Sequence, residues 1–122
     1  MNRKFRLTRS TNFERVRRFG KSYAHPLIVL IALPNQAENT RFGVAAGRSV
    51  GNAVRRNRAK RLLRSALQQQ LPVIKPGWDV VLIARHRMAG ATFQQTVSAL
   101  VALLGRAKLL QEVHDFNRQK SG

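Results

Sequence analysis

Residues 50–64 read VGNAVRRNRAKRLLR, and this stretch holds six Lys or Arg residues and no acid. If it forms an α-helix of about 3.6 residues per turn, its side chains divide into two faces. The apolar face consists of Ala59, Leu62, Leu63 and Ala66. The cationic stripe on the other side consists of Asn57, Lys60, Arg61 and Arg64. The sequence therefore predicts an amphipathic helix that packs against a core and presents positive charge.

The charge of this helix is not balanced by neighbouring acids. Between Glu38 and Asp79 the chain has no acidic residue, so the cations lack partners at helical spacing and repel one another. A solvated basic face is the ordinary explanation of a cationic helix, but the missing acids favour an anionic partner. Five of the six cations are Arg, whose planar guanidinium can clamp a phosphate through two hydrogen bonds. Arg56 and Arg58 flank the stripe, and Arg55 is expected to point towards the apolar side.

The chain as a whole is strongly basic. Its 122 residues include 23 Lys or Arg against 5 Asp or Glu, and the resulting formal charge of +18 favours a polyanionic partner. One cationic helix without a helix-turn-helix, a zipper or zinc ligands is weak evidence for sequence-specific DNA binding. RNA is the favoured partner, because it offers a dense folded backbone and single-stranded segments.

The strands predicted around this helix form one sheet. Apolar runs bounded by turn residues predict strands over residues 27–33 and 41–47, which we expect to pair with each other in antiparallel fashion. The run VVLIA (80–84) is apolar on both faces and predicts a central strand. The fold expected is therefore α/β, a small α+β sandwich whose sheet is covered by helices, in one RNA-binding domain over residues 1–122.

Three helices complete the predicted order of helix, strand, strand, helix, strand, helix. The first spans residues 10–19, the cationic helix continues to residue 71, and the last begins at a capping-box pattern at Thr92. Residues 1–9 are basic and lack apolar periodicity, so they are expected to form a flexible arm. Residues from about 110 to 122 are expected to form a flexible tail.

The sequence argues against a membrane protein. The longest apolar run is PLIVLIALP (26–34), which is shorter than the roughly 20 residues that a spanning helix needs. The basic N-terminus lacks the apolar segment of a secretory signal. The chain has no cysteine, so it can form no disulfide, and the expected location is the cytoplasm.

No catalytic or metal-binding residues are predicted. The three His residues are scattered, and the five acids form no evident carboxylate pair. Without cysteine there is no thiolate nucleophile and no cysteine-ligated zinc. Trp78 could stack on a base, but its place beside Pro76, Gly77 and a buried strand favours a plug at the edge of the core.

The same residues resemble a known motif. GNAV (51–54) followed by RRNRAKRLLR (55–64) is similar to the RNR motif of the bacterial ribonuclease P protein component. The order of the flanking segments is similar as well, with NFERV (12–16) in the first helix, RFGVAAGRSVGN (41–52) before the motif and WDVVLIAR (78–85) after it. The resemblance therefore covers nearly the whole chain.

This resemblance implies a protein subunit of the endonuclease that removes the 5′ leader from precursor tRNA. In that family the RNA subunit holds the active site and Mg²⁺ ions perform the hydrolysis, so the protein assists rather than cuts. The resemblance also implies a left-handed crossover around the RNR helix, contrary to the usual right-handed rule. A protein monomer bound to one RNA is the expected assembly.

Two sets of site residues follow from the resemblance. Those implied to bind the catalytic RNA are Arg48, Arg56, Asn57, Arg58, Lys60, Arg61 and Arg64. Those implied to line a cleft for the leader, between the first helix and the sheet, are Phe13, Arg17 and Ile31. Arg17 and Ile31 stand where members of the family have aromatic residues, so leader binding is expected to rely on charge and aliphatic contact more than on base stacking. Core packing is the alternative role of Phe13.

A structural RNA-binding protein, such as a ribosomal protein or an RNA chaperone, is the competing interpretation. It shares the small size, the basicity and the α/β pattern, so composition does not separate the two. The RNR motif favours the ribonuclease P protein. A protein-only nuclease is the third class, and it would have to cleave RNA without an RNA subunit.

Overall fold

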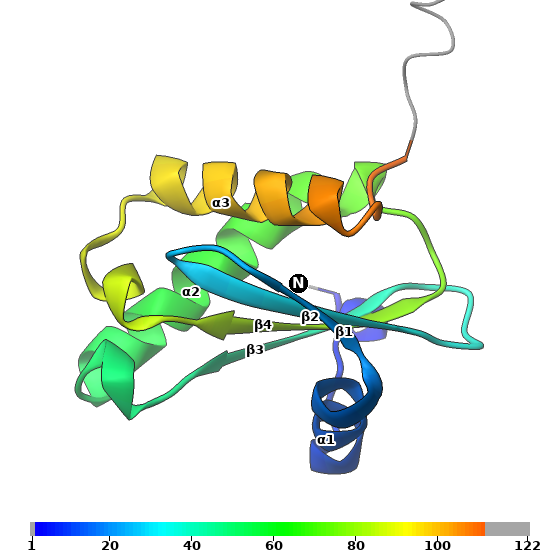
Figure 1. The fold of residues 1–122 in the computed structure, drawn as a ribbon, viewed down its shortest axis with the longest axis horizontal. Coiled ribbons are helices and arrows are strands. Elements are labelled where there is room, and N and C mark those ends of the chain that lie inside the picture. Colours follow the sequence, from blue (N-terminus) through cyan, green and yellow to red (C-terminus); the bar gives the residue numbers. More distant parts are fainter. Residues whose placement is uncertain (1, 112–122) are drawn as a thin grey trace, which may run out of the picture.

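The computed structural model describes residues 2–111 and contains a four-stranded sheet in the order β1-β2-β4-β3 (Figure 1). The strands are β1 (Lys21–Ala24), β2 (Ile28–Pro34), β3 (Arg41–Ala46) and β4 (Trp78–Ala84). β2 pairs antiparallel with both β1 and β4, whereas β3 pairs parallel with β4. The central position predicted for the 80–84 strand is thus confirmed.

Within residues 2–111, three α-helices cover the two faces of this sheet. They are α1 (Ser10–Phe19), α2 (Ala53–Gln70) and α3 (Phe93–Arg106). The described part of the chain also contains short 3₁₀ segments, namely η1 (Arg3–Phe5), η2 (Arg48–Val50), η3 (Leu71–Val73) and η4 (His86–Gly90). α2 and α3 lie on one face, and α1 lies on the other (Figure 1). The predicted α/β sandwich is therefore confirmed.

Strand alternation separates two apolar clusters. Leu30 and Leu82 face α2 and α3 and belong to the larger cluster, while Ile31 and Val81 face α1 and belong to the smaller one. Successive strand residues point to opposite faces, so consecutive positions must be apolar where both faces are covered by apolar side chains. This requirement explains the apolar runs 28–34 of β2 and 80–84 of β4.

The predicted pairing of the 27–33 and 41–47 strands is wrong. β4 lies between them, and β3 is instead an edge strand parallel to β4. Parallel neighbours need a long crossover, and α2 supplies it between β3 and β4. The left-handed sense of this crossover stays a prediction. β1 was not predicted, because its four residues, KSYA, show no apolar alternation.

Part of the N-terminal segment is packed: within the flexible arm predicted over residues 1–9, Arg6 and Leu7 contact β3, and Met1 lies outside the described residues. The side chain of Leu7 is only 4% exposed, and its backbone N–H donates to the Phe42 carbonyl at 2.8 Å. Arg6 forms a parallel bridge with Phe42. The segment thus covers part of the open edge of β3, and burial of one leucine provides the driving force.

The C-terminal end of the described chain returns to the core. Leu110 forms an antiparallel bridge with Ile74, and the Gln111 side chain donates to the Ile74 carbonyl at 3.1 Å. The start of the predicted flexible tail is therefore tied to the fold. The rest of that tail, residues 112–122, lies outside the described residues.

Candidate nucleic-acid interface

α2 has the two faces that its sequence predicts. Ala59, Leu63 and Ala66 are completely buried against the sheet, whereas Arg61 and Arg64 are exposed. Asn57 is exposed as well, and Lys60 is half-buried at the flank of the stripe. The helix begins at Ala53 because the Asn52 side chain accepts the Arg55 N–H at 3.0 Å. An anion approaching this face would therefore meet cations on a helix that is held rigidly by its core contacts.

The first turn of α2 projects beyond the core. Arg55, predicted on the apolar side at this projecting turn, is exposed, and Arg56 is half-buried. The Arg55 side chain lies over Gly51, where a Cβ atom would be 2.7 Å from the Arg55 Cδ. Gly51 has a φ of 132°, a conformation that favours glycine. The entry turn thus leaves room for Arg55 to fold back outside the core.

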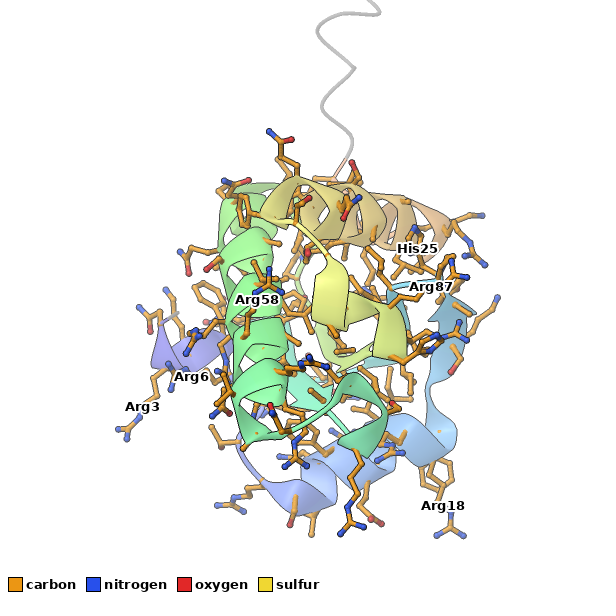
Figure 2. The ribbon with its side chains drawn as sticks, turned by 90° about the vertical axis from the view of Figure 1, so that its left-hand side faces the viewer. Arg3, Arg6, Arg18, His25, Arg58 and Arg87 are labelled. Carbon is orange, nitrogen blue, oxygen red and sulfur yellow. The ribbon has the colours of Figure 1, made fainter. Side chains whose placement is uncertain are left out.

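Arg58 is engaged with the protein itself. Its guanidinium donates to the Ala91 carbonyl at 2.9 Å and lies 3.5 Å from the Ala89 carbonyl. These contacts hold η4 and the chain after it against α2 (Figure 2). Arg48 lies in η2, immediately before the entry turn, and is exposed. The predicted RNA-binding residues therefore lie on α2 and the segment before it, and Arg58 among them donates to the backbone of the protein itself.

Phe13 packs over β3. A Cβ atom placed on Gly43 would overlap the Phe13 ring, so the contact requires glycine on the strand. Phe13 is half-buried, and it lines a small cavity of about 100 Å³ together with Arg6, Leu7 and Arg64. Arg64 belongs to the cationic stripe of α2. The two predicted RNA-binding surfaces thus meet at this cavity.

The other two residues predicted for the leader cleft lie at different depths. Arg17 is exposed on α1. Ile31 is only 6% exposed and packs under α1 with Leu7, Val16 and Val81. Phe13 and Arg17 therefore reach the surface, whereas Ile31 supports α1 from below.

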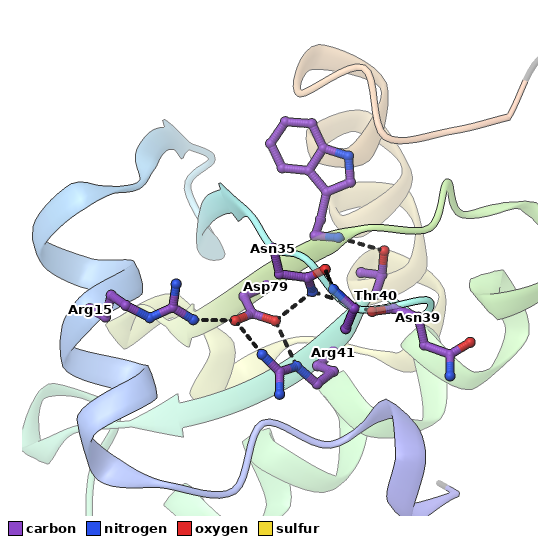
Figure 3. Close-up of polar contacts among 8 residues, drawn as sticks. Arg15, Asn35, Asn39, Thr40, Arg41 and Asp79 are labelled. Atoms are coloured by element: carbon purple, nitrogen blue, oxygen red, sulfur yellow. Dashed lines mark hydrogen bonds and ion pairs between the residues drawn. The ribbon is translucent and has the colours of Figure 1, made fainter.

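A buried carboxylate that the sequence analysis did not assign fixes α1 to the sheet (Figure 3). Asp79 on β4 is 0% exposed, and Arg15 on α1 donates to its Oδ2 at 2.5 Å. Arg41 on β3 donates from Nε to Oδ1 and from Nη2 to Oδ2, each at 2.9 Å. Asn35 adds a hydrogen bond of 2.8 Å to Oδ1. The carboxylate thus joins α1, β3, β4 and the loop after β2.

The ionisation of Asp79 follows from these partners. Burial by itself raises the pKa of Asp79, but the hydrogen bonds from Arg41, Asn35 and Arg15 and the charge of Arg41 outweigh it. The pKa of Asp79 is consequently held below its usual value. A charged residue in an apolar strand is the sequence signal for such a cluster, since a buried charge needs partners.

Trp78 packs at the edge of the larger apolar cluster. It is half-buried, and its backbone N–H donates to the Thr40 hydroxyl at 3.1 Å. These contacts agree with the predicted plug. Among residues 2–111, no three His, Asp or Glu side chains gather as a metal ion would require.

Comparison with known proteins identifies the family. The family described as Ribonuclease P matches residues 1–108. The chain belongs to the ribonuclease P protein family. A ribonuclease P protein component from Herpetosiphon aurantiacus is 40% identical over 109 residues, which cover 89% of each chain. The function predicted from the RNR motif, a part in tRNA 5′ processing with an RNA subunit, is confirmed at the level of this family.

Solved ribonuclease P proteins share the fold. The Staphylococcus aureus protein superposes with a TM-score of 0.80 at 28% identity, covering 88% of this chain and 98% of that one. The Thermotoga maritima protein gives 0.75 at 30% identity, covering 83% of this chain and 96% of that one. This ribonuclease P protein is thus a component of an endoribonuclease whose partner is an RNA. None of the helices described between residues 2 and 111 has the length and apolar character to span a membrane.

Proposed function

We propose that this ribonuclease P protein helps its catalytic RNA to remove the 5′ leader from precursor tRNA by binding both molecules on adjoining surfaces. The observation that supports this most is the small cavity that Phe13 on α1 and Arg64 on α2 both line. An RNA docked on α2 and a leader strand lying along α1 would then be neighbours at this point.

The proposed surface for the catalytic RNA is the outer face of α2 with the segment before it. Its proposed contacts are Arg48, Arg56, Asn57, Lys60, Arg61 and Arg64, and Arg58 takes part by holding η4 in place. Arg residues on a rigid helix suit phosphate oxygens, because each guanidinium can donate two parallel hydrogen bonds. With about six phosphates neutralised, the affinity should fall with salt on a log-log slope of about −4 to −5.

The proposed surface for the leader combines Phe13 and Arg17 on α1. The exposed part of the Phe13 ring offers an apolar contact to a base or a sugar, and Arg17 offers charge to a phosphate. Ile31 contributes indirectly, because it supports α1 from the sheet. Half-burial of Phe13 over Gly43 supports a mixed role in packing and in leader contact.

The chemical step is assigned to the RNA subunit with Mg²⁺, which would supply the activated water and stabilise the leaving oxygen. The described part of this chain gathers no carboxylates or histidines that could hold such ions, so the RNA would hold them. The protein would neutralise backbone charge and so lower the Mg²⁺ concentration that the RNA needs. We place this function in the cytoplasm, with one protein monomer on each RNA.

The test is a cleavage assay with a bacterial ribonuclease P RNA and precursor tRNA at limiting Mg²⁺. The protein is expected to stimulate 5′ cleavage at a single site and to cleave nothing without the RNA. A structural RNA-binding protein would instead bind both RNAs without increasing the cleavage rate. Absence of stimulation over a range of Mg²⁺ concentrations would reject the proposed function, and cleavage by the protein alone would reassign the active site.

A further inference from the structure

A cavity of about 680 Å³ lies on the face of the sheet opposite α1. Its lining comes from three places in the chain, namely the turn between β1 and β2, η4, and the start of α3. The lining residues are His25, Leu27, Arg87, Gly90, Ala91, Gln94, Gln95, Ser98 and Ala99. The cavity is a wide, open depression, and its volume is enough to seat one nucleotide against its floor.

The cavity offers one cation for a phosphate and several hydrogen-bonding groups for a base. Arg87 is exposed at the rim, and the lining contains no acid. The Nδ1 of His25 accepts the Leu27 N–H at 3.0 Å, so the ring carries its proton on Nε2 and can donate from there. Gln94 and Ser98 on α3 are exposed and supply further donors and acceptors. Leu27 and Ala99 provide an apolar floor of the kind that a base requires.

The cavity lies next to the cationic surface of α2, with η4 between them. Arg58 donates to the Ala91 carbonyl, and Ala91 lines the cavity. Figure 2 shows Arg58 on one side of η4, and Arg87 with His25 on the other. An RNA that follows the outer face of α2 can therefore reach the cavity by crossing η4.

We propose that this cavity binds one unpaired nucleotide of the ribonuclease P RNA, with its phosphate on Arg87 and its base between the floor and the polar side chains of α3. The proposal rests on the proposed function, because it takes the RNA on α2 to be the catalytic RNA. It adds a third contact, separate from the leader surface on α1. In this arrangement Arg58 positions η4, and η4 in turn positions Arg87.

A charge placed in the cavity tests the proposal. Ser98→Glu puts a carboxylate where the phosphate and base would lie, and Ala102→Glu, one turn further along α3, is the matched control at an exposed position outside the lining. We expect Ser98→Glu to weaken binding to the RNA subunit by about tenfold, because the added carboxylate repels the phosphate and occupies the place of the base. Ala102→Glu should bind within about twofold of the wild type. Equal affinities for the two variants would overturn the proposal.

Arg87 offers a second test that does not add a charge. Arg87→Ala should lower the affinity about tenfold and reduce the magnitude of the salt slope by about 0.7 to 0.9. Arg87→Lys should restore the salt slope and only part of the affinity, because it keeps the charge without the planar fork. An unchanged salt slope in Arg87→Ala would contradict a phosphate contact. Thermal melts of each variant check that the fold is retained.

The absence of cysteine from the chain permits a direct readout. A photo-crosslinker attached to Ser98→Cys in the assembled holoenzyme should react with a single unpaired region of the RNA subunit, whereas one on Ala37→Cys, in the exposed loop after β2, should not. No crosslink from Ser98→Cys, or crosslinks to precursor tRNA alone, would overturn the proposal. If the wild type stimulates cleavage in these cases, the proposed function stands while the cavity assignment fails.

Discussion

Arg15 on α1 donates to Asp79 on β4 at 2.5 Å, and this ion pair is part of the only polar cluster that we find joining α1 to the sheet within residues 2–111. Asp79 is completely buried and also receives two hydrogen bonds from Arg41. α1 presents Phe13 and Arg17, so the orientation of the proposed leader surface depends on a carboxylate on the strand beneath it.

Asp79→Asn should destabilise the protein by about 3 kcal/mol, because it leaves the Arg15 and Arg41 guanidinium groups without their counter-charge. The side chains of Arg15 and Arg41 are 40% and 32% exposed to solvent. Water can therefore solvate the two charges in part, and the expected loss of stability is at the lower end of the range for breaking a buried ion pair. Urea unfolding followed by circular dichroism gives the free energy of unfolding. Arg17→Asn, on the exposed side of α1, is the control and should change it by less than about 0.5 kcal/mol.

The same carboxylate predicts a dependence of stability on pH. The pKa of Asp79 is lower in the folded protein than in the unfolded chain, where it is about 3.9. Its contribution is therefore fully present above the unfolded value and is lost as the pH falls through the folded value. Unfolding free energies measured between about pH 3 and pH 6 should decline at the acid end in the wild type. The decline should be smaller in Asp79→Asn, and identical slopes would contradict this assignment.

Gly43→Ala should displace the Phe13 ring, because the added Cβ overlaps it. We expect a loss of about 1–3 kcal/mol in stability and a weaker preference of the holoenzyme for tRNA that bears a leader. Gly47→Ala is the matched control, since a Cβ there meets nothing within 4 Å. Binding of the two variants to precursor and mature tRNA, measured by filter retention, gives the comparison. A normal leader preference in Gly43→Ala would show that Phe13 serves packing alone.

Arg58→Ala should reduce stability by about 1–2 kcal/mol, because it removes the bond to the Ala91 carbonyl. Arg61→Ala should leave stability within about 0.5 kcal/mol, since the side chain lies on the exposed face. The salt slope of RNA binding should respond in the opposite way, with a clear decrease in Arg61→Ala and a smaller one in Arg58→Ala. If Arg58→Ala keeps its stability and lowers the magnitude of the salt slope as much as Arg61→Ala does, Arg58 contacts a phosphate instead of holding η4.

The sequence predicted α2 well because its two faces are encoded at helical spacing. Ala59, Leu63 and Arg61 take the positions that periodicity assigns to them. The apolar runs 28–34 of β2 and 80–84 of β4 were predicted for a similar reason, since consecutive positions covered by apolar layers on both faces are apolar. These features depend on neighbours along the chain, and a single sequence contains that information.

Features that depend on distant segments were not predicted. The partners of Asp79 lie 64, 44 and 38 residues away, and no local pattern links them. The insertion of β4 between β2 and β3 is a matter of topology, which apolar runs do not encode. Leu7 was missed because one leucine among basic residues has no periodicity, although it packs on Val16 and Ile31.

The central claim is that the α2 face binds the catalytic RNA and that the α1 surface binds the leader. The most direct measurement compares two variants, Arg61→Ala/Arg64→Ala and Phe13→Ala, for affinity to the RNA subunit and, at saturating protein, for the ratio of affinities for precursor and mature tRNA. We predict that the first variant loses affinity for the RNA subunit and keeps the ratio, and that the second keeps the affinity and loses the ratio. Equal changes in both properties for both variants would contradict the account.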